Sequence, residues 1–366
     1  MNDGDRLWNA ILDRPFSRSL RQIYADWLEE HGDPRGEFLR LQDRAVPRDP
    51  WREGELLRTH EADWLGSLAE HATDWDFRHG LLHQVTVDAE RFLAYGHEWV
   101  HRPGLLGLRL TNVQAHVHAL ADCPHLRRIP FLWLGYCELS APDLERLTSS
   151  PHLQGVQTLS FKEAEPFSQP LDFLFRAPSL AELRVLSLPP MSFHSGWQVP
   201  VDCTWQRLRS LDLDSIEDPN ALLSLASAAA YAKTLRRLWI TGALDSFLEP
   251  FTQLPLLRGL RSLALRGTSP SRKLHALLSS PNLASLRHLE VNTFYPMSTD
   301  IGVLLRNPSL RTLRSLTLGG MDRAEDYAAF GEPGILPGLK SLVLLPGYRE
   351  GQATPSEISP GQRALM

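Results

Sequence analysis

One histidine pair in the sequence has the spacing that zinc enzymes use. His97 and His101 are four residues apart, and Glu98 directly follows the first histidine. On an α-helix this spacing places both imidazoles on one face, where they can bind zinc while the glutamate acts as a general base. Zinc-dependent hydrolysis is therefore one candidate activity of this chain.

The segment resembles the motif of zinc metallopeptidases, but the motif is incomplete. Gly104 matches a glycine of the longer form of that motif, whereas Gly107 stands where a third histidine ligand is needed. The apolar residues around Trp99 should face the core, which turns His97 and His101 toward the flank of the helix. We keep a zinc metallohydrolase as an alternative only, and expect no catalytic residue, no metal and no cofactor.

The elements around this segment follow from a leucine phrase that recurs ten times. The phrase reads Leu-x-x-Leu-x-Leu or a close variant, and its middle positions are 24 to 27 residues apart. A period in this range indicates stacked repeats, each of which buries its apolar face against its neighbours. The middle positions are Leu108, Leu132, Leu159, Leu186, Leu211, Leu238, Leu263, Leu289, Leu316 and Leu342.

Prolines mark a second fixed point in six repeats, eight residues before the middle leucine. Because proline cannot continue a helix, we expect a helix to end there and the chain to return to a strand. The sequence predicts an α/β fold, a leucine-rich-repeat solenoid over residues 81–345 shaped as a horseshoe, with a parallel sheet inside and helices outside. The prolines are Pro124, Pro151, Pro178, Pro255, Pro281 and Pro308.

The first 45 residues have helical patterning in place of the leucine phrase. Apolar residues from Leu20 to Leu28 recur at helical spacing, Ser17 is a candidate N-cap, and Gly32 a candidate helix terminator. We expect a small helical domain over residues 1–45, a linker and capping helix over 46–80, and a flexible tail over 346–366.

This amino-terminal segment resembles the bacterial repeat-companion domain, a short module that precedes leucine-rich-repeat-like arrays. The resemblance rests on Tyr-Ala-Asp-Trp-Leu-Glu-Glu at 24–30 and Gly-Asp-Pro-Arg-Gly-Glu at 32–37. The repeats that follow, over roughly residues 80–345, are similar to ribonuclease-inhibitor-type repeats. The two resemblances imply a helical head ahead of an array, and the companion domain brings no assigned activity.

Composition favours a soluble protein, with 43% hydrophobic and 22% charged residues. No apolar run approaches the roughly 18 residues of a membrane span. The acidic amino terminus lacks the apolar segment of a secretory signal, so we expect a cytoplasmic location. Cys123, Cys137 and Cys203 are too few and too scattered for a disulfide framework or a closed zinc site.

Charge is distributed unevenly along the chain. Residues 1–100 carry 20 acidic and 12 basic side chains, and the remainder carries 23 and 26, which is too small an excess to predict nucleic-acid binding. In seven successive repeats a cation follows the first leucine of the phrase, and stacking should align these cations along one rim of the sheet. They form either a basic surface for an acidic protein, with a polyanion as the less favoured ligand, or a set of solvated side chains whose stems cover apolar neighbours. The cations are Arg184, Arg209, Arg236, Arg261, Arg287, Arg314 and Lys340.

The concave face of the predicted sheet is the candidate binding surface. Trp and Arg are enriched at interface hot spots, which makes Trp133 and Trp239 the strongest candidates. We expect a non-enzymatic scaffold that binds a protein partner, with no nucleic acid, membrane or small-molecule substrate. A regulator of a small GTPase is a second alternative, by analogy with other ribonuclease-inhibitor-like arrays. The candidate residues are Phe131, Trp133, Asp212, Arg237, Trp239, His288 and Glu290.

Overall fold

The computed structural model describes most of the chain as two compact units. Unit 1 comprises residues 1–189 and 202–208, and unit 2 comprises residues 190–201 and 209–366. The described residues are 2–43, 49–135, 137–162, 164, 172–190, 199–215, 219–242, 245–268, 272–293, 305–320, 330 and 336–345. The tail predicted over residues 346–366 lies outside these ranges.

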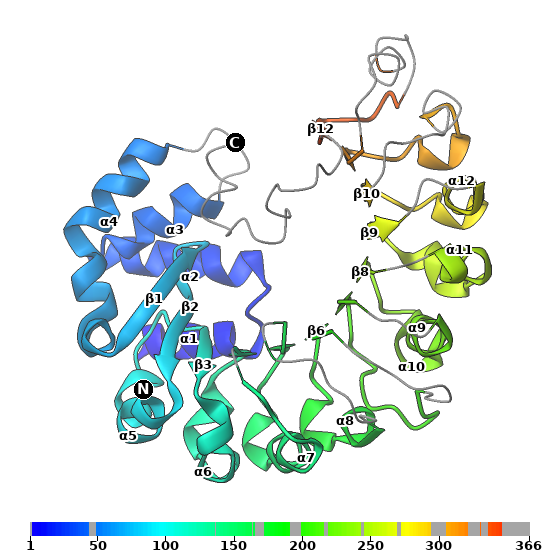
Figure 1. The fold of residues 1–366 in the computed structure, drawn as a ribbon. Helices are drawn as coiled ribbons and strands as arrows, with labels where there is room; N and C mark the ends of the chain where they lie inside the picture. Colours follow the sequence, from blue (N-terminus) through cyan, green and yellow to red (C-terminus); the bar gives the residue numbers. More distant parts are fainter. Residues whose placement is uncertain are drawn as a thin grey trace. The chain divides into compact units, whose positions relative to one another are not determined.

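Both units alternate helices with strands that are mostly parallel (Figure 1), so the predicted α/β class is confirmed. In each unit the strands lie side by side in sequence order. Within the described ranges, no helix has both the length and the apolar character needed to cross a membrane.

In unit 1 the strands place the leucine phrases in register. From β2 onward the strands are parallel, and Leu108, Leu132, Leu159 and Leu186 are successive partners. These leucines are at most 1% exposed, so the middle position of the phrase forms the core. The strands are β1 (Ala72–Arg78), β2 (Leu81–Asp88), β3 (Gly107–Thr111), β4 (Phe131–Leu134), β5 (Thr158–Ser160) and β6 (Val185–Leu188).

Strand β1 has no counterpart in the leucine pattern. It pairs antiparallel with β2 through a turn at His79 and Gly80, whose φ angles of 53° and 72° are both left-handed. Left-handed residues at both central positions produce the tight turn that suits a twisted hairpin. β1 thus covers the first edge of the parallel strands, as an array end requires.

Helices and short 3-10 helices, written η, connect the strands of unit 1. Each of the three regularly spaced prolines of this unit begins a 3-10 helix that leads into the next strand, two or three residues after the preceding α-helix ends. The elements are α4 (Pro50–Leu65), η1 (Gly66–Glu70), α5 (Ala89–Trp99), η2 (Val113–Ala115), α6 (Val117–Ala121), η3 (Pro124–Arg128), α7 (Ala141–Thr148), η4 (Pro151–Leu153), α8 (Asp172–Arg176) and η5 (Pro178–Leu180).

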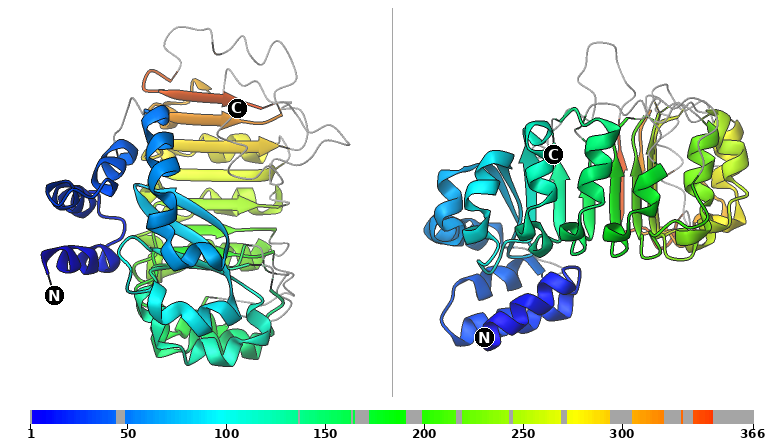
Figure 2. Two further views of the ribbon diagram at one scale, coloured as in Figure 1. Left: turned by 90° about the vertical axis from the view of Figure 1, so that its left-hand side faces the viewer. Right: turned by 90° about the horizontal axis from the view of Figure 1, so that it is seen from below.

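The amino-terminal helices α1 (Asp3–Asp13), α2 (Arg18–Glu30) and α3 (Arg35–Asp43) form the head of unit 1. Ser17 Oγ accepts the Leu20 N–H, and Gly32 has a φ of 72°, so both predicted caps are confirmed. The head lies at one end of the strands, apart from helices α5 to α8 (Figure 2).

In unit 2 the parallel strands are β7 (Ser210–Leu213), β8 (Arg237–Thr241), β9 (Ser262–Thr268), β10 (His288–Thr293), β11 (Ser315–Leu318) and β12 (Ser341–Leu344). Their connections contain α9 (Pro219–Ser227), α10 (Ala229–Ala232), α11 (Asp245–Phe251), η6 (Pro255–Gly259), α12 (Arg272–Leu278), η7 (Pro281–Leu283) and η8 (Pro308–Leu310). Helices α9 to α12 lie on one side of the strands, and no described helix of this unit covers the other side (Figure 1).

Candidate interaction surface

Two rows of side chains alternate with the buried leucines of unit 2. Because side chains alternate between the two faces of a strand, both rows lie on the side away from helices α9 to α12, here called the open face. One row is Ser210, Arg237, Ser262, His288, Ser315 and Ser341, and the other is Asp212, Trp239, Ala264, Glu290, Thr317 and Val343. The structure therefore brings together five predicted site residues: Asp212, Arg237, Trp239, His288 and Glu290.

Three side chains on adjacent strands form a connected group at the centre of the open face. The guanidinium carbon of Arg266 lies 5.5 Å from the centroid of the Trp239 ring, and Arg266 Nε donates to Glu290 Oε1 at 2.7 Å. A cation over an indole and a charge-assisted hydrogen bond both restrict side-chain motion. Trp239 remains 38% exposed, so the group presents an ordered aromatic surface to solvent.

Arg266 was not among the residues that the leucine phrase predicts for this face. It follows the last leucine of the phrase in β9, and it pairs in register with Thr241 of β8 and Asn292 of β10. The leucine phrase ends at Leu265, one residue before Arg266. If the strand is extended past the phrase, alternation places Arg266 on the same face as Ala264, and this is the sequence signal that could have identified it.

The predicted alignment of cations is confirmed in unit 2, where six of them form a column at the edge where the strands begin. Each N–H donates to the carbonyl oxygen of the preceding cation at 2.7 to 2.8 Å, in the order Arg209, Arg236, Arg261, Arg287, Arg314 and Lys340. Arg236 is half-buried and the other five side chains are exposed. The backbone, and not the side chains, therefore sets the spacing of this cation column.

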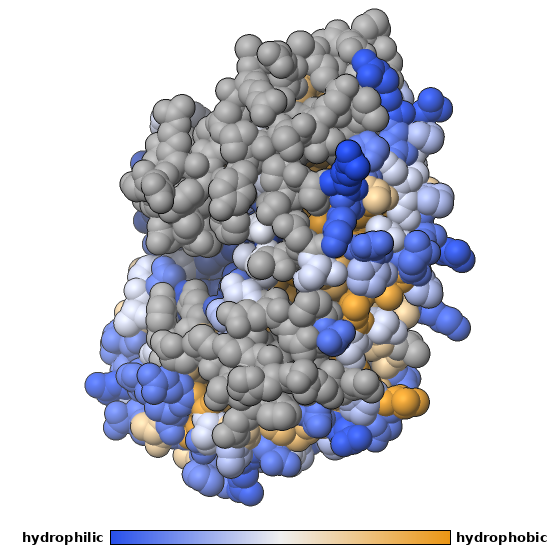
Figure 3. Space-filling model, turned by 45° about the vertical axis from the view of Figure 1, so that its right-hand side comes forward, coloured by the Kyte–Doolittle hydropathy of each residue, from blue (hydrophilic) through white to orange (hydrophobic). Residues whose placement is uncertain are grey.

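His288 lies within the positive field of this edge. Partial burial lowers the pKa of its imidazole, and the nearby guanidinium groups of Arg237, Arg314 and Arg287 lower it further. Burial and the three cations thus both favour the neutral form of this ring. In the space-filling view, hydrophilic side chains cover most of the described surface, with small hydrophobic areas between them (Figure 3).

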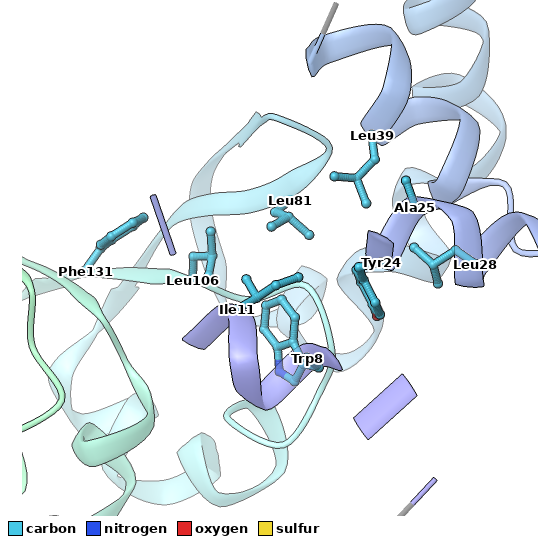
Figure 4. Packing of buried hydrophobic residues seen from close by; sticks show 9 residues of the cluster. All are labelled: Trp8, Ile11, Tyr24, Ala25, Leu28, Leu39, Leu81, Leu106 and Phe131. Carbon is cyan, nitrogen blue, oxygen red and sulfur yellow. The ribbon is translucent and has the colours of Figure 1, made fainter. Parts of the chain in front are cut away.

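Phe131 was predicted to contact a partner, and the structure corrects this prediction. Its side chain is 2% exposed because the head packs over it. Its ring centroid lies 5.3 Å from that of Phe16, and it belongs to a buried cluster with Trp8, Ile11 and Leu106 (Figure 4). Phe131 thus joins the head to the strands of unit 1 and is not available to a partner.

Trp133, the other site residue predicted in unit 1, is half-buried beside this cluster. Its ring centroid lies 5.5 Å from that of His83 and 6.1 Å from that of Phe131. A Cβ atom added at Gly107 would lie 2.5 Å from the Trp133 ring, so the indole packs directly on the neighbouring backbone. Much of this tryptophan is therefore engaged in intramolecular packing.

The head also contacts the edge where the strands of unit 1 begin. Gln157 occupies the position there that corresponds to the cation column, since its N–H donates to Pro130 O and its carbonyl accepts the Arg184 N–H. Its side-chain Nε2 donates to Asp13 O at 2.9 Å and to Leu12 O at 3.4 Å, at the end of α1. At this edge of unit 1, Gln157 thus binds the carbonyl oxygens at the end of α1.

The histidine pair does not form the arrangement that its spacing requires. Helix α5 ends at Trp99, so His101 lies beyond the helix and does not share a helical face with His97. The side chains of His97 and Glu98 are 58% and 51% exposed. Neither residue is therefore in the sheltered cleft that a catalytic zinc needs.

A different trio, Asp88, Glu90 and His116, places its potential ligand atoms within 4.8 Å of one another. Both oxygens of Asp88 already accept hydrogen bonds, from the Glu90 N–H at 2.9 Å and from Asn112 Nδ2. Asp88 is the N-cap of α5, so local helix structure accounts for its position.

The three cysteines are buried free thiols. Burial raises the pKa of the Cys137 thiol and of the Cys203 thiol to about 11. Since the thiolate is the reactive form, these cysteines are inert structural residues at neutral pH.

Neither protein-family models nor curated proteins yield a match to this chain. The resemblance of residues 20–42 to the repeat-companion domain rests on the sequence motifs at 24–30 and 32–37 alone. The geometry independently shows an α/β array with one polar, partly aromatic face that no described helix of unit 2 covers.

Proposed function

We propose that this chain is a non-enzymatic binding scaffold, a leucine-rich-repeat solenoid with a repeat-companion head, which holds a protein partner on the open face of unit 2. The regular period of the leucines and their in-register pairing support the repeat assignment. The proposal includes a cytoplasmic location, which buried free cysteines favour.

The group of Trp239, Arg266 and Glu290 is the observation that carries the binding proposal. Tryptophan and arginine are enriched among the hot spots of protein interfaces, and an already ordered side chain loses little entropy on binding. The three side chains come from three adjacent strands of one sheet, so a partner meets a surface with a defined shape. Trp239, the most exposed of the three, is the expected anchor.

Replacing Trp239 by alanine tests this proposal. We expect the affinity for the partner, isolated from the native organism with the full-length chain, to fall at least tenfold because the anchor is lost, which corresponds to about 1.4 kcal/mol. Binding is measured by calorimetry with purified partner, and thermal unfolding checks that the variant is folded.

Trp51→Ala is the matched control, because Trp51 is 85% exposed but lies on α4 of unit 1. It should leave the affinity unchanged. If Trp239→Ala binds as tightly as the unmodified chain, the open face is not the partner's site.

A further inference from the structure

The cation column is a regular array of like charges. Adjacent strands of a sheet are about 4.8 Å apart, so the six positions from Arg209 to Lys340 extend over roughly 24 Å. Arg237 adds a further exposed cation in the next row of β8. A chain that carries carboxylates at regular intervals could pair with cations spaced in this way along one edge.

Within the part of the chain that the structure describes, acidic side chains do not pair with this column. Glu290 is engaged by Arg266, outside the column. Among the residues that the structure describes, no carboxylate forms an ion pair with Arg209, Arg261, Arg287 or Arg314. The depressed pKa of His288 agrees with this excess of positive charge. The column therefore lacks counter-charges within the described ranges.

The corresponding position in unit 1 shows what this edge can bind. There Gln157 donates to two carbonyl oxygens at the carboxyl end of α1, the end at which the helix dipole is negative. In unit 1 the neutral amide of Gln157 therefore pairs with the partial negative charges of carbonyl oxygens. In unit 2 the equivalent donors are full cations, which are suited to full negative charges.

We infer that the partner presents an extended acidic segment, rich in Asp and Glu, which lies along the cation column of unit 2. The inference rests on the proposed function and adds the chemistry of the partner. An extended chain advances about 3.3 Å per residue, so roughly seven residues would pass along the column. Its alternate side chains point to one side, and flexible arginines can reach carboxylates at that interval.

A protein segment fits these charges better than a nucleic acid does. The whole chain carries a net charge of −5, and its first 100 residues hold 20 acidic side chains. Such a field repels a long phosphate backbone, whereas a short acidic segment interacts mainly with the cations closest to it.

A fluorescein-labelled peptide of twelve residues, alternating Glu and Ser, tests the inference by fluorescence anisotropy with the full chain at low salt. The triple variant Arg261→Gln, Arg287→Gln, Arg314→Gln should bind the peptide at least tenfold more weakly. The control triple Arg58→Gln, Arg91→Gln, Arg272→Gln removes equal charge from exposed arginines outside the column, and should stay within twofold of the unmodified chain.

Three results would overturn the acidic-segment inference: no binding of the peptide by the unmodified chain, equal loss in both triples, or tighter binding of a twelve-nucleotide single-stranded DNA. Thermal unfolding of both triples confirms that each is folded. Binding of the isolated partner by Trp239→Ala and by the column triple Arg261→Gln, Arg287→Gln, Arg314→Gln distinguishes failure of the acidic-segment inference from failure of the proposed function. If Trp239→Ala loses the partner while the column triple keeps it, the scaffold stands and the acidic segment fails; if neither loses it, both fail.

Discussion

At the scale of single residues, His83 shows how packing determines the chemistry of a side chain. Its ring packs against the aromatic rings of Phe131 and Trp133, at centroid distances of 5.0 and 5.5 Å. Burial, together with the nearby charge of Arg78, lowers the pKa of this imidazole to about 4. His83 therefore behaves as a neutral ring of the unit 1 core, although histidine is usually read as a polar residue.

This depressed pKa predicts acid sensitivity. The unfolded state binds a proton near pH 6.5 and the folded state only near pH 4, so the stability due to neutral His83 is lost as the pH falls through this window. Between pH 8 and pH 5 the free energy of unfolding should fall by about 2 kcal/mol on this account. Guanidinium unfolding of the chain and of His83→Gln at both pH values measures it, and an equal pH dependence in the two proteins would contradict the prediction.

Residue types alone could predict part of the candidate site. The alternation around Leu238 and Leu289 is sufficient to place Trp239 and Glu290 on one face, and the structure agrees. Phe131 follows the same pattern but is covered by Phe16, a residue more than 100 positions away whose contact no local pattern encodes. Arg266 was missed because its strand continues past the phrase.

At the scale of elements, the hairpin turn between β1 and β2 is fitted to helix α3. The Gly80 N–H donates to Gln42 Oε1 at 2.6 Å, and His79 Nδ1 lies 3.0 Å from Asp43 Oδ1. A Cβ atom added at Gly80 would lie 2.3 Å from the Leu39 Cα. Glycine is needed there both for its left-handed backbone and for the close approach of the two segments.

Substitution of Gly80 by alanine should therefore loosen the head. Left-handed strain and the clash with Leu39 together predict a loss of about 3 kcal/mol in the free energy of unfolding, measured by chemical denaturation. Gly54→Ala is the control, since its Cβ would meet nothing within 4 Å inside α4, and it should stabilise by about 0.5 to 1 kcal/mol. Two variants of equal stability would show that the turn is not a constrained contact.

Most elements of the array follow from the leucine phrase, whereas the structure at its first edge does not. All ten middle leucines lie in strands, and the prolines at fixed spacing lead into them through 3-10 helices. β1 escapes prediction because Thr73, Asp74 and Asp76 interrupt its apolar residues and no leucine phrase is present. The need to cover an edge is a property of the assembled sheet and leaves no periodic signal in the sequence.

At the scale of the whole molecule, charge separates along the sequence. The first 100 residues have an excess of acidic side chains, whereas the remainder has a small excess of basic ones. Six basic residues of unit 2 are aligned along one edge of its strands. Long-range attraction between this edge and an acidic partner should speed their encounter more than it strengthens the final complex.

The association rate should consequently depend on salt. Raising the ionic strength from about 0.02 M to about 0.5 M shortens the screening length to a few ångströms, so the rate constant should fall at least tenfold in stopped-flow measurements with the partner. Trp239→Ala should keep this salt dependence and dissociate faster, whereas the column triple should lose most of it. A salt-independent rate for the unmodified chain would contradict an electrostatic role for the column.

The backbone ladder that aligns the cation column also imposes a cost on the unoccupied protein. Its hydrogen bonds hold the backbones of six like-charged residues at strand spacing, and like charges that close in water repel each other by up to about 1 kcal/mol. The sheet therefore keeps the charges together against their mutual repulsion. An acidic segment on the column would relieve this repulsion, so that occupancy of the site and resistance of unit 2 to unfolding would rise together.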